Sequence, residues 1–108
     1  MVNVRAAIEG VDLDAFAESL APNVVWVGLW PGELCRNRDD VLEMFARMRE
    51  QGVSPQPRIV LEKSGVLVVD PHLDGRHHVL VLDEGLVSEV RAYPDQASAL
   101  AAVEERPW

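Results

Sequence analysis

The sequence has little cysteine and no long apolar run. Cys35 is the single cysteine, so no internal disulfide can form and the cysteine content does not indicate secretion. No apolar stretch approaches the length of a membrane span, and Met1–Gly10 lacks the charged-then-apolar pattern of a signal peptide. A glycine-rich phosphate loop is also missing, which disfavours nucleotide chemistry. These absences predict a soluble, cytoplasmic protein with no membrane partner and no cofactor.

Positive charge is also scarce. Acidic side chains outnumber basic ones by 18 to 10, and Lys63 is the only lysine. The formal net charge of −8 argues against a nucleic-acid partner, because nucleic acids bind basic surfaces. The hydrophobic fraction of 48% is typical of globular proteins and excludes wholesale disorder. The 108 residues are enough for one domain, 1–108, with one core.

The first half of the chain has the apolar periodicity of helices. Capping and helix-breaking residues predict where three helices begin and end. The first ends at Gly10, the second runs from the N-cap Asp12 to Pro22, and the third runs from Asn37 or Asp39 to Gly52. A short β run, 24–29, separates the second helix from the third. A fourth helix is predicted after Asp95.

The second half of the chain predicts two β-hairpins. Arg58–Lys63 and Val66–Asp70 flank the two-residue turn Ser64-Gly65, and His77–Asp83 and Leu86–Tyr93 flank Glu84-Gly85. Helices followed by antiparallel strands predict an α+β domain, in which a curved antiparallel sheet wraps around the N-terminal helices. Such a sheet forms a cone with a central pocket.

Three segments carry a resemblance to a known family. The first has the pattern of a short helix followed by a strand and is EGVDLDAFAESLAPNVVWVG (Glu9–Gly28). The second leads into a helix and is CRNRDDVLEMFARM (Cys35–Met48). The third has the pattern of a closing hairpin and is HHVLVLDEGLVSEVRAYPD (His77–Asp95). In this order they resemble the SnoaL-like branch of the nuclear-transport-factor-2-like superfamily. The family usually has a longer first helix than Met1–Glu9 allows. The resemblance implies a cone fold, frequent homodimers, and activities such as polyketide cyclisation, isomerisation, dehydration and epoxide opening.

The register of the second hairpin predicts which side chains share a face. A two-residue turn at Glu84-Gly85 places Leu80 opposite Glu89 and His78 opposite Arg91, on one face with Tyr93. In one interpretation this polar face lies inside the cone. In the other, the small apolar side chains of the opposite face pack against the helices, and the polar face meets solvent or a dimer partner. A β-bulge in the last strand would exchange the faces.

The first interpretation gives a candidate site. Glu89 is the predicted base, because apolar neighbours would raise its pKa, and His78 is the predicted acid or orienting group. The candidate ligand-binding residues are aromatic or basic side chains near the expected pocket: Trp26, Trp30, Arg91 and Tyr93. Core packing is the alternative role for both tryptophans.

Neither the His- and Asp-rich stretch nor the cysteine predicts a further site. Asp70–His78 has a spacing that matches no metal motif, so we expect an exposed polar turn and no metal site. Cys35 has no histidine partner at a recognisable spacing, which favours a small buried hydrophobe over a nucleophile.

Three hypotheses about function follow. The protein is a cofactor-independent isomerase, cyclase or lyase that acts on a small apolar metabolite by acid–base chemistry. Alternatively, it is a non-catalytic dimeric module with a sealed or passively binding cone, or a subunit that binds a partner through an exposed sheet face. A homodimer through the outer sheet face is expected, because the short strands are apolar on both sides and three helices cannot cover them.

Overall fold

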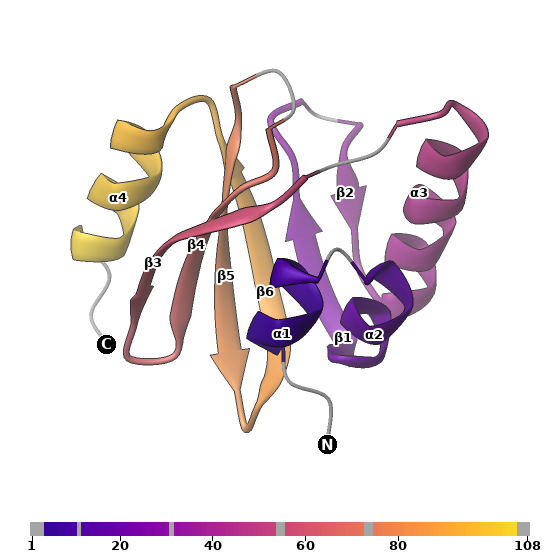
Figure 1. Cartoon of the computed structure of the whole chain (residues 1–108), viewed down its shortest axis with the longest axis horizontal. Coiled ribbons are helices and arrows are strands. Elements are labelled where there is room, and N and C mark those ends of the chain that lie inside the picture. The colour runs from indigo at the N-terminus through magenta and orange to yellow at the C-terminus, as the bar shows by residue number, and fades with distance from the viewer. Residues whose placement is uncertain (1–3, 11, 31, 54–55, 73–74, 106–108) are drawn as a thin grey trace.

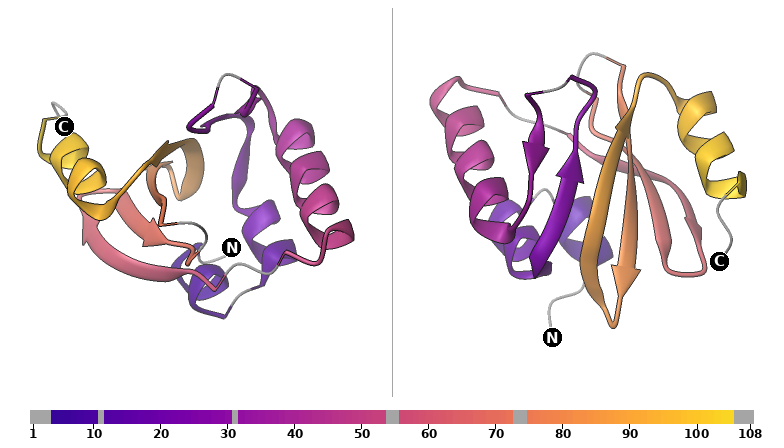
Figure 2. Two further views of the ribbon diagram at one scale, coloured as in Figure 1. Left: turned by 90° about the horizontal axis from the view of Figure 1, so that it is seen from above. Right: turned by 180° about the vertical axis from the view of Figure 1, so that it is seen from behind.

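The computed structural model describes residues 4–10, 12–30, 32–53, 56–72 and 75–105. Its helices and strands follow one another in the order α1 (Val4–Glu9), α2 (Leu13–Glu18), β1 (Leu20–Val27), β2 (Leu34–Cys35), α3 (Arg38–Glu50), β3 (Arg58–Lys63), β4 (Val66–Asp70), β5 (His77–Asp83), β6 (Leu86–Tyr93) and α4 (Gln96–Glu105). Figure 1 shows the sheet between α3 and α4, and Figure 2 shows its curvature, with α1–α3 on one side and α4 on the other. The predicted α+β class is confirmed.

The six strands form one sheet in the order β2-β1-β6-β5-β4-β3. Both predicted hairpins are present with the predicted bounds. Their turns have positive φ at both central residues, 48° and 80° at Ser64-Gly65 and 52° and 83° at Glu84-Gly85, as two-residue hairpin turns require. The sheet is not wholly antiparallel as expected, because β1 runs parallel to β6.

The first strand begins earlier than the sequence indicated. β1 starts at Leu20, whereas the β run was predicted over 24–29. Helix α2 ends at Glu18, four positions before the expected breaker Pro22, which lies inside β1. The β1–β6 register shifts between Leu20 and Val25, so proline occupies an irregular part of the ladder.

Side-chain caps hold the helix starts as predicted. Asp12 Oδ1 accepts a hydrogen bond from Ala15 N at 3.0 Å, and Asn37, rather than Asp39, caps α3 by accepting from Asp40 N at 2.9 Å. Asp95 Oδ1 accepts from Ser98 N at 2.8 Å, and this hydrogen bond lowers the pKa of the Asp95 carboxyl. The described helices include none that is long and apolar enough to cross a membrane.

Apolar side chains form one core on each side of the sheet. The inner core packs α1, α2 and α3 against the sheet through residues such as Phe45, Leu67 and Val90. The outer core packs Val68 and Val79 of the sheet against helix α4. Because a strand alternates its side chains between faces, β4 contributes to both cores.

A β-bulge at Ser88 sets the faces of β6. Leu82 pairs with Val87, as the turn predicts, but Val81 then pairs with Glu89, which leaves Ser88 as an extra residue. The Ser88 hydroxyl donates to Val81 O at 3.2 Å. Beyond this point every partner is shifted by one position from the predicted register.

The predicted faces are therefore wrong beyond the bulge. His78 pairs with Ala92 instead of Arg91, and Leu80 pairs with Val90 instead of Glu89. His78 lies on the inner face, whereas the three other polar residues of the predicted face lie on the outer one: Glu89, Arg91 and Tyr93. A shift of one residue moves a side chain to the opposite side of a sheet, so neither interpretation of the faces was right.

The end of β1 depends on a glycine. Gly28 N donates to Glu33 O at 2.7 Å, and a Cβ on Gly28 would lie 2.3 Å from Glu33 Cβ. Real Cβ atoms do not approach so closely, so the backbone or Glu33 would have to move. Gly32, in the same connection, would place its Cβ in open space.

We therefore expect Gly28→Ala to lower the free energy of unfolding by about 1–3 kcal/mol, the usual cost of overpacking. Gly32→Ala is the matched control and should change it by no more than about 0.5 kcal/mol. Urea unfolding followed by circular dichroism measures both. Equal stabilities of the two variants would contradict the close approach of Gly28 to Glu33.

Candidate functional site

A cavity of about 520 Å³ lies on the inner side of the sheet, bordered by α1, α2 and α3. This volume suits a small-molecule ligand. Most of the described lining residues are apolar: Ala7, Ile8, Phe16, Trp26, Met44, Phe45, Met48, Val53, Pro57, Val69, Pro71 and Leu80. The polar ones are Asp12, Glu33, Gln51, Arg76 and His78. The cavity is thus apolar with a small polar part.

Aromatic rings form one wall of the cavity. The ring centroids of Trp26 and Phe45 are 5.8 Å apart with the planes at 86°, and those of Phe45 and Phe16 are 6.1 Å apart. The edge-on contact with Phe45 fixes the orientation of the Trp26 ring, and Phe16 packs against Phe45 with the planes tilted by 39°. Sequence periodicity indicates which side of a helix is apolar, but it does not distinguish a side chain that borders a cavity, such as Phe16 or Phe45, from one packed in the core.

Trp26 and His78 meet at the cavity. Their ring centroids are 5.3 Å apart with the planes at 64°. Trp26 belongs to β1 and His78 to β5, and β6 lies between these strands. Both side chains reach the inner face because Trp26 pairs with Val90 and His78 pairs with Ala92. The structure therefore brings these two predicted residues together.

An ion pair forms much of the polar part of the lining. Arg76 Nη1 donates to Glu33 Oε2 at 3.2 Å, and Glu33 Oε1 accepts from Trp30 N at 3.0 Å. The Arg76 side chain is 18% exposed and that of Glu33 is 37% exposed. Sequence reasoning missed both residues, because the contact joins two connections that are 43 positions apart.

The other predicted site residues do not line the cavity. Glu89 and Arg91 lie on the outer face, where Arg91 Nε donates to Glu89 Oε1 at 2.9 Å, and Tyr93 packs against the outer core. Their predicted placement at the polar end of the pocket is wrong, because the bulge at Ser88 turns them away from Trp26. The Trp30 side chain is 66% exposed and is absent from the described lining.

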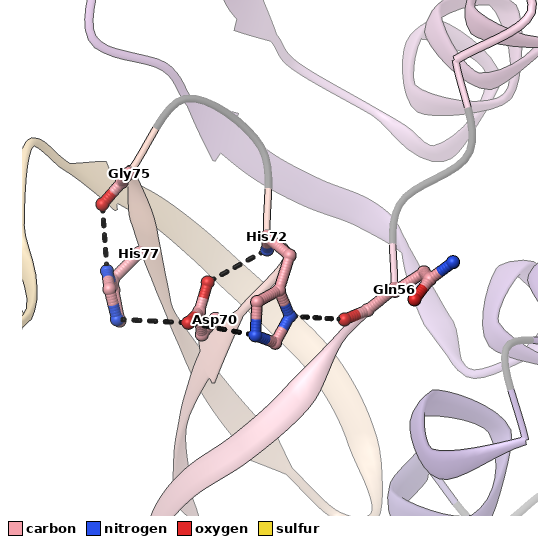
Figure 3. A network of polar contacts seen from close by, with 5 residues as sticks. All are labelled: Gln56, Asp70, His72, Gly75 and His77. Carbon is pink, nitrogen blue, oxygen red and sulfur yellow. Dashed lines mark hydrogen bonds and ion pairs between the residues drawn. The ribbon is translucent and has the colours of Figure 1, made fainter.

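A polar network joins two connections beside the cavity (Figure 3). Asp70 Oδ1 accepts from His72 N at 2.8 Å, and its Oδ2 lies 3.5 Å from His72 Nε2 and 3.8 Å from His77 Nε2. His72 Nδ1 lies 2.6 Å from Gln56 O, and His77 Nδ1 lies 3.0 Å from Gly75 O. These contacts tie the segment before β3 to the connection between β4 and β5.

The network supports the cavity wall, and its described members are not arranged as metal ligands. Gln56 N donates to Pro71 O at 3.0 Å, and both Pro57 and Pro71 line the cavity. Figure 3 shows the Asp70 carboxylate between the two imidazole rings, not three ligands around a common centre. Within the described ranges no group of three His, Cys, Asp or Glu residues is arranged to hold a metal ion. Asp74 lies outside the described residues.

Cys35 is a buried side chain opposite Trp26 in the β1–β2 pair. Burial raises the pKa of its thiol, which disfavours the nucleophilic thiolate. The environment therefore fits the expected role of a small buried hydrophobe.

Comparisons with known proteins identify the fold. No sequence-family model matches the chain, and no curated protein matches it. Among solved structures, TerC co-crystallised with polyporic acid has a TM-score of 0.60 at 15% identity, over 96% of this chain and 94% of that one. A candidate SnoaL-like polyketide cyclase from Mesorhizobium loti has a TM-score of 0.59 at 13% identity, over 81% and 89%.

An NTF-2 like protein of unknown function from Burkholderia xenovorans LB400 is similar to the same degree. Its TM-score is 0.59 at 14% identity, over 98% of this chain and 90% of that one. Matches at sequence identities this low show a shared fold only. They do not show that this chain has the activity of a neighbour. The chain therefore has the same fold as these SnoaL-like and NTF-2 like structures.

Proposed function

We propose that the protein binds a small, flat, largely apolar molecule in the cavity. The observation that carries this proposal is the cavity of about 520 Å³ with the Trp26 and Phe45 rings in its wall. Aromatic rings offer a flat ligand a large contact area at low conformational cost. A cone filled by its own side chains would have left no such volume.

A second proposal concerns catalysis. With Glu89 on the outer face, His78 is the imidazole among the described lining residues, and it contacts the proposed aromatic wall. An imidazole is able to remove a proton from a carbon next to a carbonyl group and return it to another atom of the same molecule. This chemistry needs no cofactor, and it would make the protein an isomerase, cyclase or lyase. A non-catalytic binding module is the alternative.

A neutral fluorescent probe, phenylnaphthylamine, tests ligand binding. We expect Trp26→Ala to weaken its binding about tenfold, which corresponds to the loss of one aromatic contact of about 1.4 kcal/mol. Trp30→Ala is the matched control and should leave binding unchanged, because the exposed Trp30 side chain is not part of the described lining. Fluorescence titration measures both. Equal losses in the two variants would show that the probe binds outside the cavity.

Proton transfer is testable without knowing the substrate. The flat ketone β-tetralone carries exchangeable protons next to its carbonyl group. If His78 acts on bound ketones, the protein should accelerate the exchange of these protons for deuterium. His78→Gln should lower the exchange rate about 100-fold. Proton NMR in D₂O measures the exchange. Binding of the ketone without any acceleration over buffer would instead support the non-catalytic module.

We also propose a homodimer through the outer face of β1 and β2. Helix α4 packs against β4, β5 and β6. Beyond these strands Leu34, 45% exposed, lies opposite Val27 on the outer face, near the Glu89–Arg91 ion pair. Leu34 and Val27 place apolar surface beside this ion pair on the outer face, which suits a self-complementary two-fold contact.

Sedimentation should show twice the chain mass of 12.0 kDa at micromolar concentration. Leu34→Glu should return the protein to a monomer, because it places a charge in the proposed contact. Leu42→Glu is the control, since Leu42 is similarly exposed, at 39%, but lies on α3. A wild-type protein that sediments as a monomer would refute the dimer.

A further inference from the structure

We propose that the ligand of the cavity carries one anionic oxygen group, such as a carboxylate or sulfonate, that pairs with Arg76. The proposal rests on the proposed ligand-binding function, and it adds the chemical class of the ligand. The argument for an anionic ligand is charge complementarity with the Arg76 side chain. Among the described lining residues Arg76 is the one guanidinium or ammonium group.

Arg76 is poorly exposed for a charged side chain. At 18% exposure its guanidinium has lost much of its contact with water, so it needs an anionic partner. In the structure Glu33 is such a partner, at 3.2 Å. Fork-shaped guanidinium groups bind carboxylates and other oxyanions through two donors at once, which makes this group suited to a ligand anion.

Glu33 is the more exposed member of the pair. Its side chain is 37% exposed, and it belongs to the connection between β1 and β2 rather than to a strand. An incoming anion would therefore compete with Glu33 for Arg76, and the displaced carboxylate could turn towards water. Glu33 holds the guanidinium in place before the ligand arrives, and this competition lowers the apparent affinity.

The position of Arg76 relative to the aromatic wall constrains the shape of the ligand. Arg76 immediately precedes β5, and Arg76, His78 and Leu80 line the cavity at alternate positions along the chain. Extended backbone places the Cα atoms of residues two positions apart about 7 Å from each other. A ligand whose anion pairs with Arg76 would therefore extend its rings towards His78 and Trp26, which contact each other. A two-ring scaffold with an acidic group at one end meets this requirement.

Two probes with the same scaffold isolate the charge. Anilinonaphthalene sulfonate is phenylnaphthylamine with an added sulfonate, and both become fluorescent in apolar cavities. We expect Arg76→Gln to weaken sulfonate binding about tenfold and to leave binding of the neutral probe within about twofold. Glu33→Gln should strengthen sulfonate binding severalfold, because the competing carboxylate is gone. Arg91→Gln, on the outer face, is the matched control and should change neither probe.

Further variants separate the failure of this proposal from failure of ligand binding itself. If Arg76→Gln does not fold, Arg76→Lys keeps the charge and should still prefer the sulfonate to the neutral probe. Trp26→Ala should weaken both probes, which places the sulfonate in the cavity. Equal effects of Arg76→Gln on the two probes, no gain in Glu33→Gln, or a sulfonate affinity that ignores Trp26→Ala would each overturn the proposal. Absence of neutral-probe binding would instead overturn the proposed function.

Discussion

One extra residue in β6 determines which side chains face the cavity. Ser88 has no residue opposite it in the β5–β6 register, so Val81 pairs with Glu89 while Leu82 still pairs with Val87. Side chains alternate between the faces of a sheet, and the shift therefore exchanges the two sets beyond the bulge. It places Val90 in the inner core and turns Glu89 outward. The polar chemistry of the cavity consequently comes from β5 and from the connections, not from β6.

The local features of the fold could be predicted from the sequence because they are fixed by neighbouring residues. Ser64-Gly65 and Glu84-Gly85 adopt the positive φ values of hairpin turns, and Asp12 and Asn37 accept the hydrogen bonds expected of helix caps. The parallel pairing of β1 with β6 was not predictable in this way. It joins segments far apart in the sequence, and no turn between them sets their register.

The candidate site likewise contains residues that could be predicted from the sequence and residues that could not. Trp26 and His78 were predicted from a strand pattern and a family resemblance, and the structure brings them into contact. The Arg76–Glu33 ion pair was not predictable, because it joins two irregular connections whose residues are 43 positions apart in the sequence. The placement of Glu89 and Arg91 was wrong for a single reason, the bulge, which a turn-based register does not include.

The most direct test of this account is the proton–proton Overhauser spectrum of the protein in solution. If the bulge lies at Ser88, the ring protons of His78 should give cross-peaks to the indole of Trp26, whose ring centroid lies 5.3 Å from that of His78. Cross-peaks from the His78 ring to the side chains of Arg91 and Tyr93, without any to Trp26, would indicate an unbulged register. That result would return Glu89 to the face of His78 and contradict the account.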